Sequence, residues 1–164
     1  TGMTVLENLL FSGSEVNNDS LIKSVIKSKS QRKYEENLKD KAKNILEELN
    51  ILHMADSYAR ELSGGQKKLL ELARSIINEP EILLLDEPLA GVNPKLAEDI
   101  LSLIKKLSNE GITILMVEHN IEAVMKISER IVVLAEGSPI ADGNPNEIRT
   151  DRNVIEAYLG KDND

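Results

Sequence analysis

In the stretch Ile82-Leu83-Leu84-Leu85-Asp86-Glu87, four apolar residues lead directly into two carboxylates, and Pro88 follows. A short apolar run of this kind predicts a strand over residues 81–86 that is buried on both faces, as in a parallel sheet. Open α/β sheets bind their ligands at the carboxyl ends of such strands. The sequence therefore places Asp86 and Glu87 where chemistry can occur. Taken alone, an Asp-Glu-Pro triplet is also compatible with a strand end capped by solvated charges.

A second motif, Leu62-Ser63-Gly64-Gly65-Gln66, stands one predicted helix upstream and directly before that helix. The N–H groups, hydroxyl and amide at a helix N-terminus can meet an anion at the positive end of the helix dipole. Glycine allows close approach of the backbone. Taken alone, Ser-Gly-Gly is explained by an ordinary helix cap. The position of this motif one helix before the Asp-Glu strand favours a role in phosphate chemistry instead. In phosphoryl transfer, a strand-end aspartate holds Mg²⁺ and a neighbouring carboxylate polarises the attacking water.

His119 lies just beyond a second predicted strand, residues 112–117. If the two strands are parallel neighbours, His119 lies at the same sheet edge as Asp86 and Glu87, where an imidazole could hydrogen-bond a terminal phosphate. A surface or capping role is the alternative, and it is the interpretation kept for His53. The turn 90–93 could contact a partner subunit or simply lead into the next helix.

The remaining elements follow from apolar periodicity and from caps. The capping box Thr4 to Glu7 predicts an opening helix. Further helices are predicted around residues 38–49, 66–77, 94–110, 121–128, 145–149 and 153–159, and Gly160 is the expected C-cap of the last one. A hairpin is predicted from 131–135 to 140–141, and a loop with a marginal helix is predicted over 12–33. Alternating strands and helices predict an α/β layered sheet with right-handed crossovers.

Bulk composition limits the class of protein further. The chain has 164 residues, 41% of them hydrophobic, which suits one domain with a core. A formal charge of -8 argues against a nucleic-acid partner, because phosphate neutralisation needs clustered Lys and Arg. The absence of cysteine excludes disulfides and thiolate metal sites. Apolar runs are far shorter than the roughly 20 residues of a spanning helix, so we expect no direct membrane insertion.

The chain resembles ABC-type ATPases in four motifs that occur in the order of that family. Residues 62–66 are similar to its signature motif and residues 82–87 to its Walker B strand, while residues 90–93 are similar to its D-loop and His119 to its H-loop. The chain is similar in particular to the ATP-binding subunits of branched-chain amino acid importers. The segments that carry this similarity are Met3 to Leu9, Ala90 to Pro94 and Val154 to Gly160. Lipopolysaccharide-export ATPases are similar at several of the same places.

The resemblance implies ATP and Mg²⁺ as cofactors. It implies that Asp86 helps to hold Mg²⁺ through water, that Glu87 is the general base and that His119 reaches the γ-phosphate. Ser63, Gly64, Gly65 and Gln66 would contact, in trans, the ATP held by a second ATPase subunit of a homo- or heterodimer. ATP-driven dimerisation would energise transport through transmembrane permease subunits, approached by residues 15–41, on the inner face of the cell membrane.

The same resemblance implies a partial P-loop NTPase fold over residues 1–164, with a helical subdomain at about 4–78 and the Walker B side of the catalytic core at about 79–164. The sequence contains no G-x-x-x-x-G-K-[ST] loop. The simplest expectation is a truncated domain with a gap between the strands 112–117 and 131–135.

We expect this chain alone to bind ATP weakly, to hydrolyse it negligibly and to self-associate through sheet edges. A non-catalytic module that supplies its signature motif to another ATPase is the alternative. ATPases of DNA repair or translation fit less well, because their long coiled coil or second cassette is absent.

Overall fold

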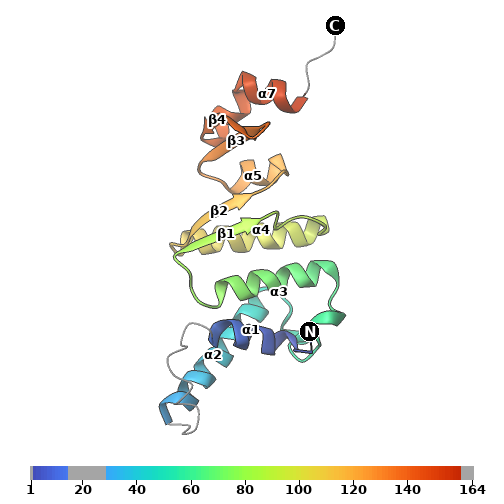
Figure 1. The fold of residues 1–164 in the computed structure, drawn as a ribbon, viewed down its shortest axis with the longest axis vertical. Coiled ribbons are helices and arrows are strands. Elements are labelled where there is room, and N and C mark those ends of the chain that lie inside the picture. The colour runs from blue at the N-terminus through green and yellow to red at the C-terminus, as the bar shows by residue number, and fades with distance from the viewer. Residues whose placement is uncertain (1, 15–28, 160–164) are drawn as a thin grey trace. The chain divides into compact units, whose positions relative to one another are not determined.

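The computed structural model describes residues 2–14 and 29–159, which form two compact units, Thr1–Val117 and Glu118–Asp164 (Figure 1). The first unit contains α1 (Val5–Ser14), α2 (Lys29–Glu48), η3 (Leu52–Met54), η4 (Ala59–Glu61), α3 (Gly64–Ile76), β1 (Ile82–Asp86), α4 (Pro94–Asn109) and β2 (Thr113–Val117). The second contains α5 (Ile121–Ile127), β3 (Ile131–Ala135), β4 (Ser138–Gly143), α6 (Pro145–Thr150) and α7 (Arg152–Leu159). The subdomain boundary near residue 78 stays a prediction. Residues 15–28, which belong both to the predicted loop and marginal helix over 12–33 and to the permease-facing segment, lie outside the described residues, as does the cap at Gly160. The two ends of the 12–33 stretch are helical, because residues 12–14 belong to α1 and residues 29–33 to α2.

Helix α1 begins at the predicted capping box. The Thr4 backbone N–H donates to Glu7 Oε2 at 2.7 Å, and the Glu7 N–H donates to Thr4 Oγ1 at 3.2 Å. The apolar sides of α1, α2 and α3 then meet in one core, whose fully buried members include Leu9 and Leu46. The stripe predicted over residues 38–49 is confirmed, because Ala42, Ile45, Leu46 and Leu49 are all buried.

Polar contacts tie the end of α1 to α2 and α3. Arg74 Nε donates to Ser12 Oγ at 2.9 Å, and Asn78 Nδ2 donates to the Ser12 carbonyl at 3.0 Å. The Tyr34 hydroxyl donates to the Gly13 carbonyl at 3.2 Å. The bonds from Asn78 and Tyr34 supply partners for carbonyls that the end of a helix leaves without one. They fix α3, whose first residues carry the Ser-Gly-Gly motif, to the rest of the first unit.

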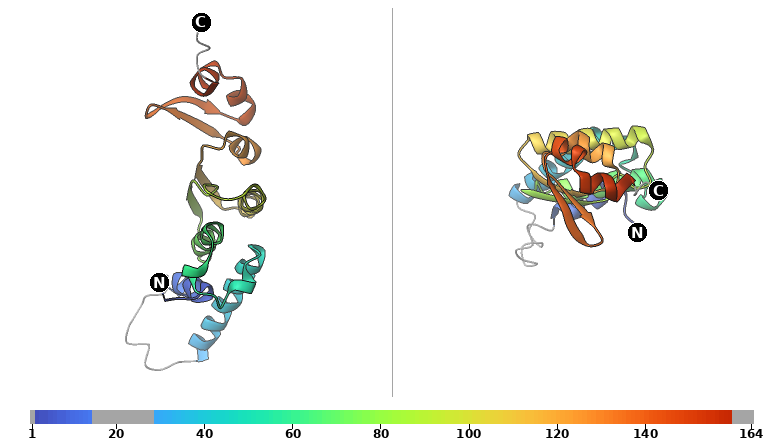
Figure 2. Two further views of the ribbon diagram at one scale, coloured as in Figure 1. Left: turned by 90° about the vertical axis from the view of Figure 1, so that its right-hand side faces the viewer. Right: turned by 90° about the horizontal axis from the view of Figure 1, so that it is seen from above.

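Strands β1 and β2 pair in parallel, with Ile82 opposite Thr113 and Asp86 opposite Val117. Helix α4 covers one face of this pair (Figure 2). Leu83 and Leu85, which alternate with the exposed residues of β1, are buried. The other face is exposed, and its large apolar members are Ile82, Leu84, Leu115 and Val117. The prediction of a strand buried on both faces is therefore wrong in this unit. An apolar run supplies two faces that can be buried, but burial requires a layer of structure on each.

The second unit is built on the predicted β3–β4 hairpin, which pairs antiparallel with an irregularity between Val133 and Leu134. Its turn uses Glu136 and Gly137 with φ of 50° and 79°, the left-handed conformations of a tight hairpin turn. Ile131, Val133 and Ile148 form its core. The predicted strands thus build two separate two-stranded sheets rather than one, β1 with β2 and β3 with β4.

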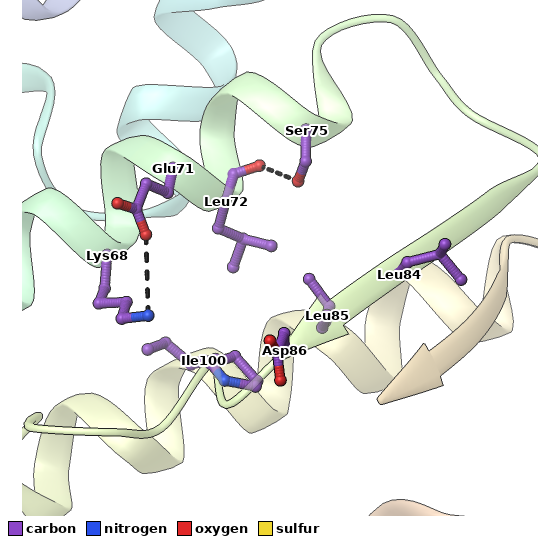
Figure 3. A pocket seen from close by; sticks show the side chains of 9 residues that line it. Lys68, Glu71, Leu72, Ser75, Leu84, Leu85, Asp86 and Ile100 are labelled. Atoms are coloured by element: carbon purple, nitrogen blue, oxygen red, sulfur yellow. Dashed lines mark hydrogen bonds and ion pairs between the residues drawn. The ribbon is translucent and has the colours of Figure 1, made fainter. Parts of the chain in front are cut away.

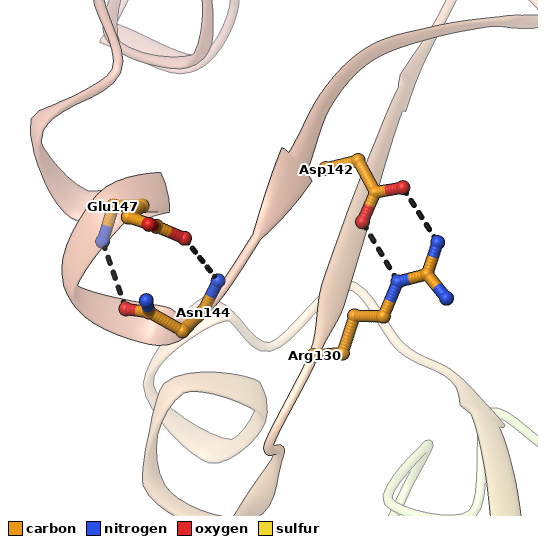
Figure 4. A network of polar contacts seen from close by, with 4 residues as sticks. All are labelled: Arg130, Asp142, Asn144 and Glu147. Atoms are coloured by element: carbon orange, nitrogen blue, oxygen red, sulfur yellow. Dashed lines mark hydrogen bonds and ion pairs between the residues drawn. The ribbon is translucent and has the colours of Figure 1, made fainter.

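Figure 4 shows the polar contacts beside this hairpin. Asn144 and Glu147 form a capping box at the start of α6, with bonds of 2.8 and 3.2 Å. Across the hairpin, Arg130 donates from Nε and Nη2 to the two carboxylate oxygens of Asp142, at 2.9 and 2.7 Å. Such bidentate pairs fix geometry as well as charge.

The hydrogen bonds from Arg130 lower the pKa of Asp142 below its ordinary value of 3.8 and outweigh the opposing effect of desolvation. A carboxyl group with a lowered folded-state pKa stabilises the fold above its unfolded pKa, and this contribution is lost as pH falls through the folded value. We therefore expect the hairpin to lose a small stabilising contribution below about pH 4. Carboxyl-carbon NMR titration should show Asp142 titrating below its ordinary value, and Arg130→Gln should move that pKa upward. An Asp142 pKa at or above the ordinary value in the unaltered chain would contradict this.

Candidate functional site

The two carboxylates lie at the carboxyl end of β1, as predicted, and both residues are exposed. Glu87 adopts a φ of 44°, in the left-handed region that residues other than glycine seldom occupy. Its N–H donates to the carbonyl of Val117 at 2.9 Å, and its own carbonyl accepts from the Ala90 N–H at 3.1 Å. The end of β2 therefore holds the Glu87 backbone in place despite the strain.

A short, well-defined turn connects Glu87 to α4. Leu89 is buried and anchors this turn in the unit, while Gly91 adopts a φ of 71°. Asn93 caps α4, with its Oδ1 accepting from the Leu96 N–H at 2.9 Å, and Pro94 occupies the first helical position. Residues 87–93 form this connection, the β1–α4 turn.

The Ser-Gly-Gly-Gln segment forms the N-terminus of α3 through a capping box. The Ser63 N–H donates to Gln66 Oε1 at 2.9 Å, and the Gln66 N–H donates to Ser63 Oγ at 3.4 Å. The oxygens of both side chains are thus used as acceptors within the cap. A serine hydroxyl and a glutamine amide keep further donor hydrogens, the polarity that an anion requires. The structure therefore confirms that this segment caps α3, while its contact with an anion stays a prediction.

Helix α3 and the end of β1 line a hollow of about 180 Å³ that is smaller than most small-molecule sites (Figure 3). Its lining residues are Lys68, Glu71, Leu72, Ser75, Leu84, Leu85, Asp86, Pro88 and Ile100. Lys68 Nζ lies 3.8 Å from Glu71 Oε2, and the Ser75 hydroxyl donates to the Leu72 carbonyl at 2.7 Å. The hollow is too small to enclose a nucleotide, so the chemistry available here is that of Asp86 at an open sheet edge.

His119 belongs to the second unit, where it is exposed two residues after β2 ends at Val117. The prediction for this residue depended on two parallel neighbouring strands, and the pairing of β1 with β2 confirms that arrangement. The role of His119 itself stays a prediction. His53 lies exposed in η3, in agreement with the surface role expected for it.

Within the described part of the chain, no group of three or more His, Asp or Glu side chains could hold a metal ion. Magnesium commonly keeps several waters and takes only one or two carboxylates together with substrate phosphates. The exposed pair Asp86 and Glu87 has the right donor chemistry for a magnesium ion that arrives with a nucleotide, and it does not form a dedicated protein cage. None of the helices described here is long and apolar enough to cross a membrane.

Two features of the site could not be read from the sequence. Lys68 lines the same hollow as Asp86, although it looks like an ordinary solvated position of an amphipathic helix. Leu96, in the first turn of α4, packs against Gly65. The apolar stripe of α4 already included Leu96, but periodicity shows only that a residue faces inward and not which residue it meets.

A parallel strand pair that ends in Asp-Glu, next to a helix capped by Ser-Gly-Gly, defines an α/β protein with the parts of a nucleoside triphosphatase. Comparison with known families agrees with this class. The family model described as ABC transporter matches residues 1–90, and the model described as branched-chain amino acid ATP-binding cassette transporter matches residues 140–164. The chain belongs to the ABC transporter family.

Its relatives include the high-affinity branched-chain amino acid transport ATP-binding protein BraF of Pseudomonas aeruginosa, 42% identical over 97% of this chain. The corresponding protein LivG of Escherichia coli is 41% identical over 97% of the chain, and a probable LivG of Archaeoglobus fulgidus is 44% identical over 96%. The chain spans 63% of the length of BraF and of the E. coli protein, and 60% of the archaeal one.

Solved structures show the same fold. An ATP-binding cassette of an ABC transporter in its ADP conformation matches with a TM-score of 0.74 and 39% identity, over 98% of this chain and 64% of its own. An inward-facing putative metal-chelate type ABC transporter matches with a TM-score of 0.78 and 25% identity, over 97% of this chain and 59% of its own. The α/β fold expected from the sequence, a partial P-loop NTPase fold with a helical portion, is thereby confirmed.

Proposed function

We propose that this chain forms part of the ATP-binding and ATP-hydrolysing subunit of an ABC importer for branched-chain amino acids. The observation that carries the proposal is the arrangement of the first unit. Asp86 and Glu87 end a strand that pairs in parallel with β2, while the Ser63–Gln66 cap begins the helix that lines the same hollow as Asp86. The names of the relatives and the family model that matches residues 140–164 support the class of solute.

In this proposal the cofactors are ATP and Mg²⁺, and the metal supplies charge neutralisation on the phosphates. Asp86 contributes a carboxylate to the ion through water. Glu87, held with its backbone on Val117, accepts the proton of the attacking water, and His119 donates a hydrogen bond to the γ-phosphate. Residues 63–66 present their donors to the ATP held by a second ATPase subunit. Closure of that dimer drives permease subunits, which place the assembly at the inner face of the membrane.

A second candidate is a non-catalytic module that supplies its signature motif in trans to another ATPase. The preformed capping box favours it, because this segment is ordered within the chain itself. The hollow beside Asp86, too small to hold a nucleotide, is also consistent with a chain that completes the site of another subunit.

Replacing Ser63 by alanine tests the contact in trans that both candidates share. We mix the chain with a complete ATPase subunit of this family and expect Ser63→Ala to lower Mg²⁺-ATP turnover by about tenfold or more, because a donor to the nucleotide is lost. Thr4→Ala is the matched control, since it removes another capping-box hydroxyl in the same unit at a similar cost in helix stability.

An equal effect of Ser63→Ala and Thr4→Ala would assign the loss to weakened helices and would count against the trans contact. Adding Glu87→Gln to the chain separates the two candidates. A further loss of turnover supports a catalytic chain, whereas unchanged turnover supports the non-catalytic module.

A further inference from the structure

We propose that Leu96 is a positioning residue that holds the Ser63–Gln66 segment and the β1–α4 turn in a fixed position relative to each other, which is called their register below. Its side chain occupies the space left by the absent side chain of Gly65, and this space is called the socket. A Cβ atom added at Gly65 would lie 2.6 Å from Leu96 Cδ2, closer than such atoms approach in real structures. A Cβ atom added at the neighbouring Gly64 would meet nothing within 4 Å. The two adjacent glycines therefore differ in one physical respect, the presence of Leu96.

Leu96 contacts both motifs. Its side chain lies against Gly65, and its backbone N–H donates to Asn93 Oδ1 at 2.9 Å, at the end of the β1–α4 turn. That turn begins at Glu87, whose N–H is bonded to the last carbonyl of β2. Moving the Leu96 side chain out of its socket therefore disturbs a connection that runs from the cap of α3 to Glu87.

The backbone of Gly65 does not itself require glycine, because its φ is not positive. An alanine in a helix is more favourable than a glycine. The reason for a glycine at position 65 is therefore space, because Leu96 occupies the place where a side chain would lie. Because Leu96 Cδ2 is the end of a flexible side chain, a methyl group at position 65 would displace it at little cost in stability and would lose the register.

Three variants of the chain test the contact directly. Gly64→Ala should raise the thermal midpoint by about 2 °C and leave the Leu96 methyl signals in place. Gly65→Ala should give no such gain, should shift the Leu96 methyl signals and should speed hydrogen exchange of the Leu96 amide. In Gly65→Ala/Leu96→Ala, the midpoint should rise relative to Leu96→Ala alone. Identical behaviour of Gly64→Ala and Gly65→Ala in the methyl spectrum would overturn the socket.

The positioning role rests on the proposed function, and turnover in the mixture with a complete ATPase subunit tests it. We expect Gly65→Ala and Leu96→Ala each to reduce turnover by about tenfold. Leu96→Met, which keeps a flexible apolar side chain beside Gly65, should retain most of the turnover. Turnover of Leu96→Ala equal to that of the unaltered chain would overturn the positioning role alone. Turnover that does not depend on Ser63 would overturn the proposed function and the positioning role with it, whatever the methyl spectrum shows.

Discussion

Glu87→Gln is expected to reduce ATP turnover by about 100-fold or more at the site to which this chain supplies the general base. The amide has nearly the shape of the carboxylate but cannot take a proton from water. The backbone at this position is held by the Val117 carbonyl at 2.9 Å, so the substitution should leave the turn in place. Steady-state phosphate release checks the result when it is measured with a complete partner subunit whose own catalytic glutamate is already glutamine, and an unchanged thermal midpoint shows that the fold is intact.

Glu79→Gln is the matched control for this experiment. Glu79 is also a glutamate with a positive φ, 49°, in the same unit, and its carboxylate pairs with Lys41 at 2.7 Å. Its replacement removes a charge and an exposed ion pair, which contribute little to stability. Turnover should therefore remain near that of the unaltered chain. If Glu79→Gln and Glu87→Gln reduced turnover equally, the effect would be one of charge, and Glu87 would not be the general base.

Leu46→Ala is expected to lower the free energy of unfolding of the first unit by about 2 to 5 kcal/mol. Leu46 has no exposed surface and lies in the core where α1, α2 and α3 meet, so its truncation leaves a cavity that neighbouring side chains fill only in part. Urea unfolding followed by far-UV circular dichroism measures the loss. A change below about 1 kcal/mol would mean that the three helices do not share a well-packed core.

Leu84→Ala provides the same chemical change on the open sheet face. Leu84 is 69% exposed, so its truncation should change stability by no more than about 0.5 kcal/mol. The chain should also self-associate less, because one apolar side chain of that face is gone. A cost as large as that of Leu46→Ala would show that the face is covered in solution.

Local features of this fold could be predicted from the sequence because their causes lie within a few residues. The capping box at Thr4 and Glu7, the cap of α4 at Asn93 and the left-handed turn at Glu136 and Gly137 each depend on neighbours along the chain. The capping box at Asn144 and Glu147 carries the same kind of signal, Asn followed by Glu three residues later, and would have been found by the same rule.

The placement of Asp86 and Glu87 at a sheet edge was also predictable, because an apolar run that ends in acids has few other interpretations in an α/β chain. The burial of that run was not. Leu83 and Leu84 are identical neighbours in the sequence, yet one is 3% exposed and the other 69%, because α4 covers a single face of the β1–β2 pair. No local pattern reveals how many layers will pack against a strand.

The sequence alone therefore specified the caps, the hairpin, the acidic strand end and most of the helices, since each arises from short-range sterics and hydrogen bonding. It did not predict that α2 begins at Lys29, nor the short helices η3 and η4. Only the folded chain shows which face of β1 is covered, that Lys68 shares a hollow with Asp86, and that Leu96 rests on Gly65. These are contacts between segments separated by many residues along the chain. Their formation depends on how whole elements pack, and the periodicity of one element does not contain the identity of its partner.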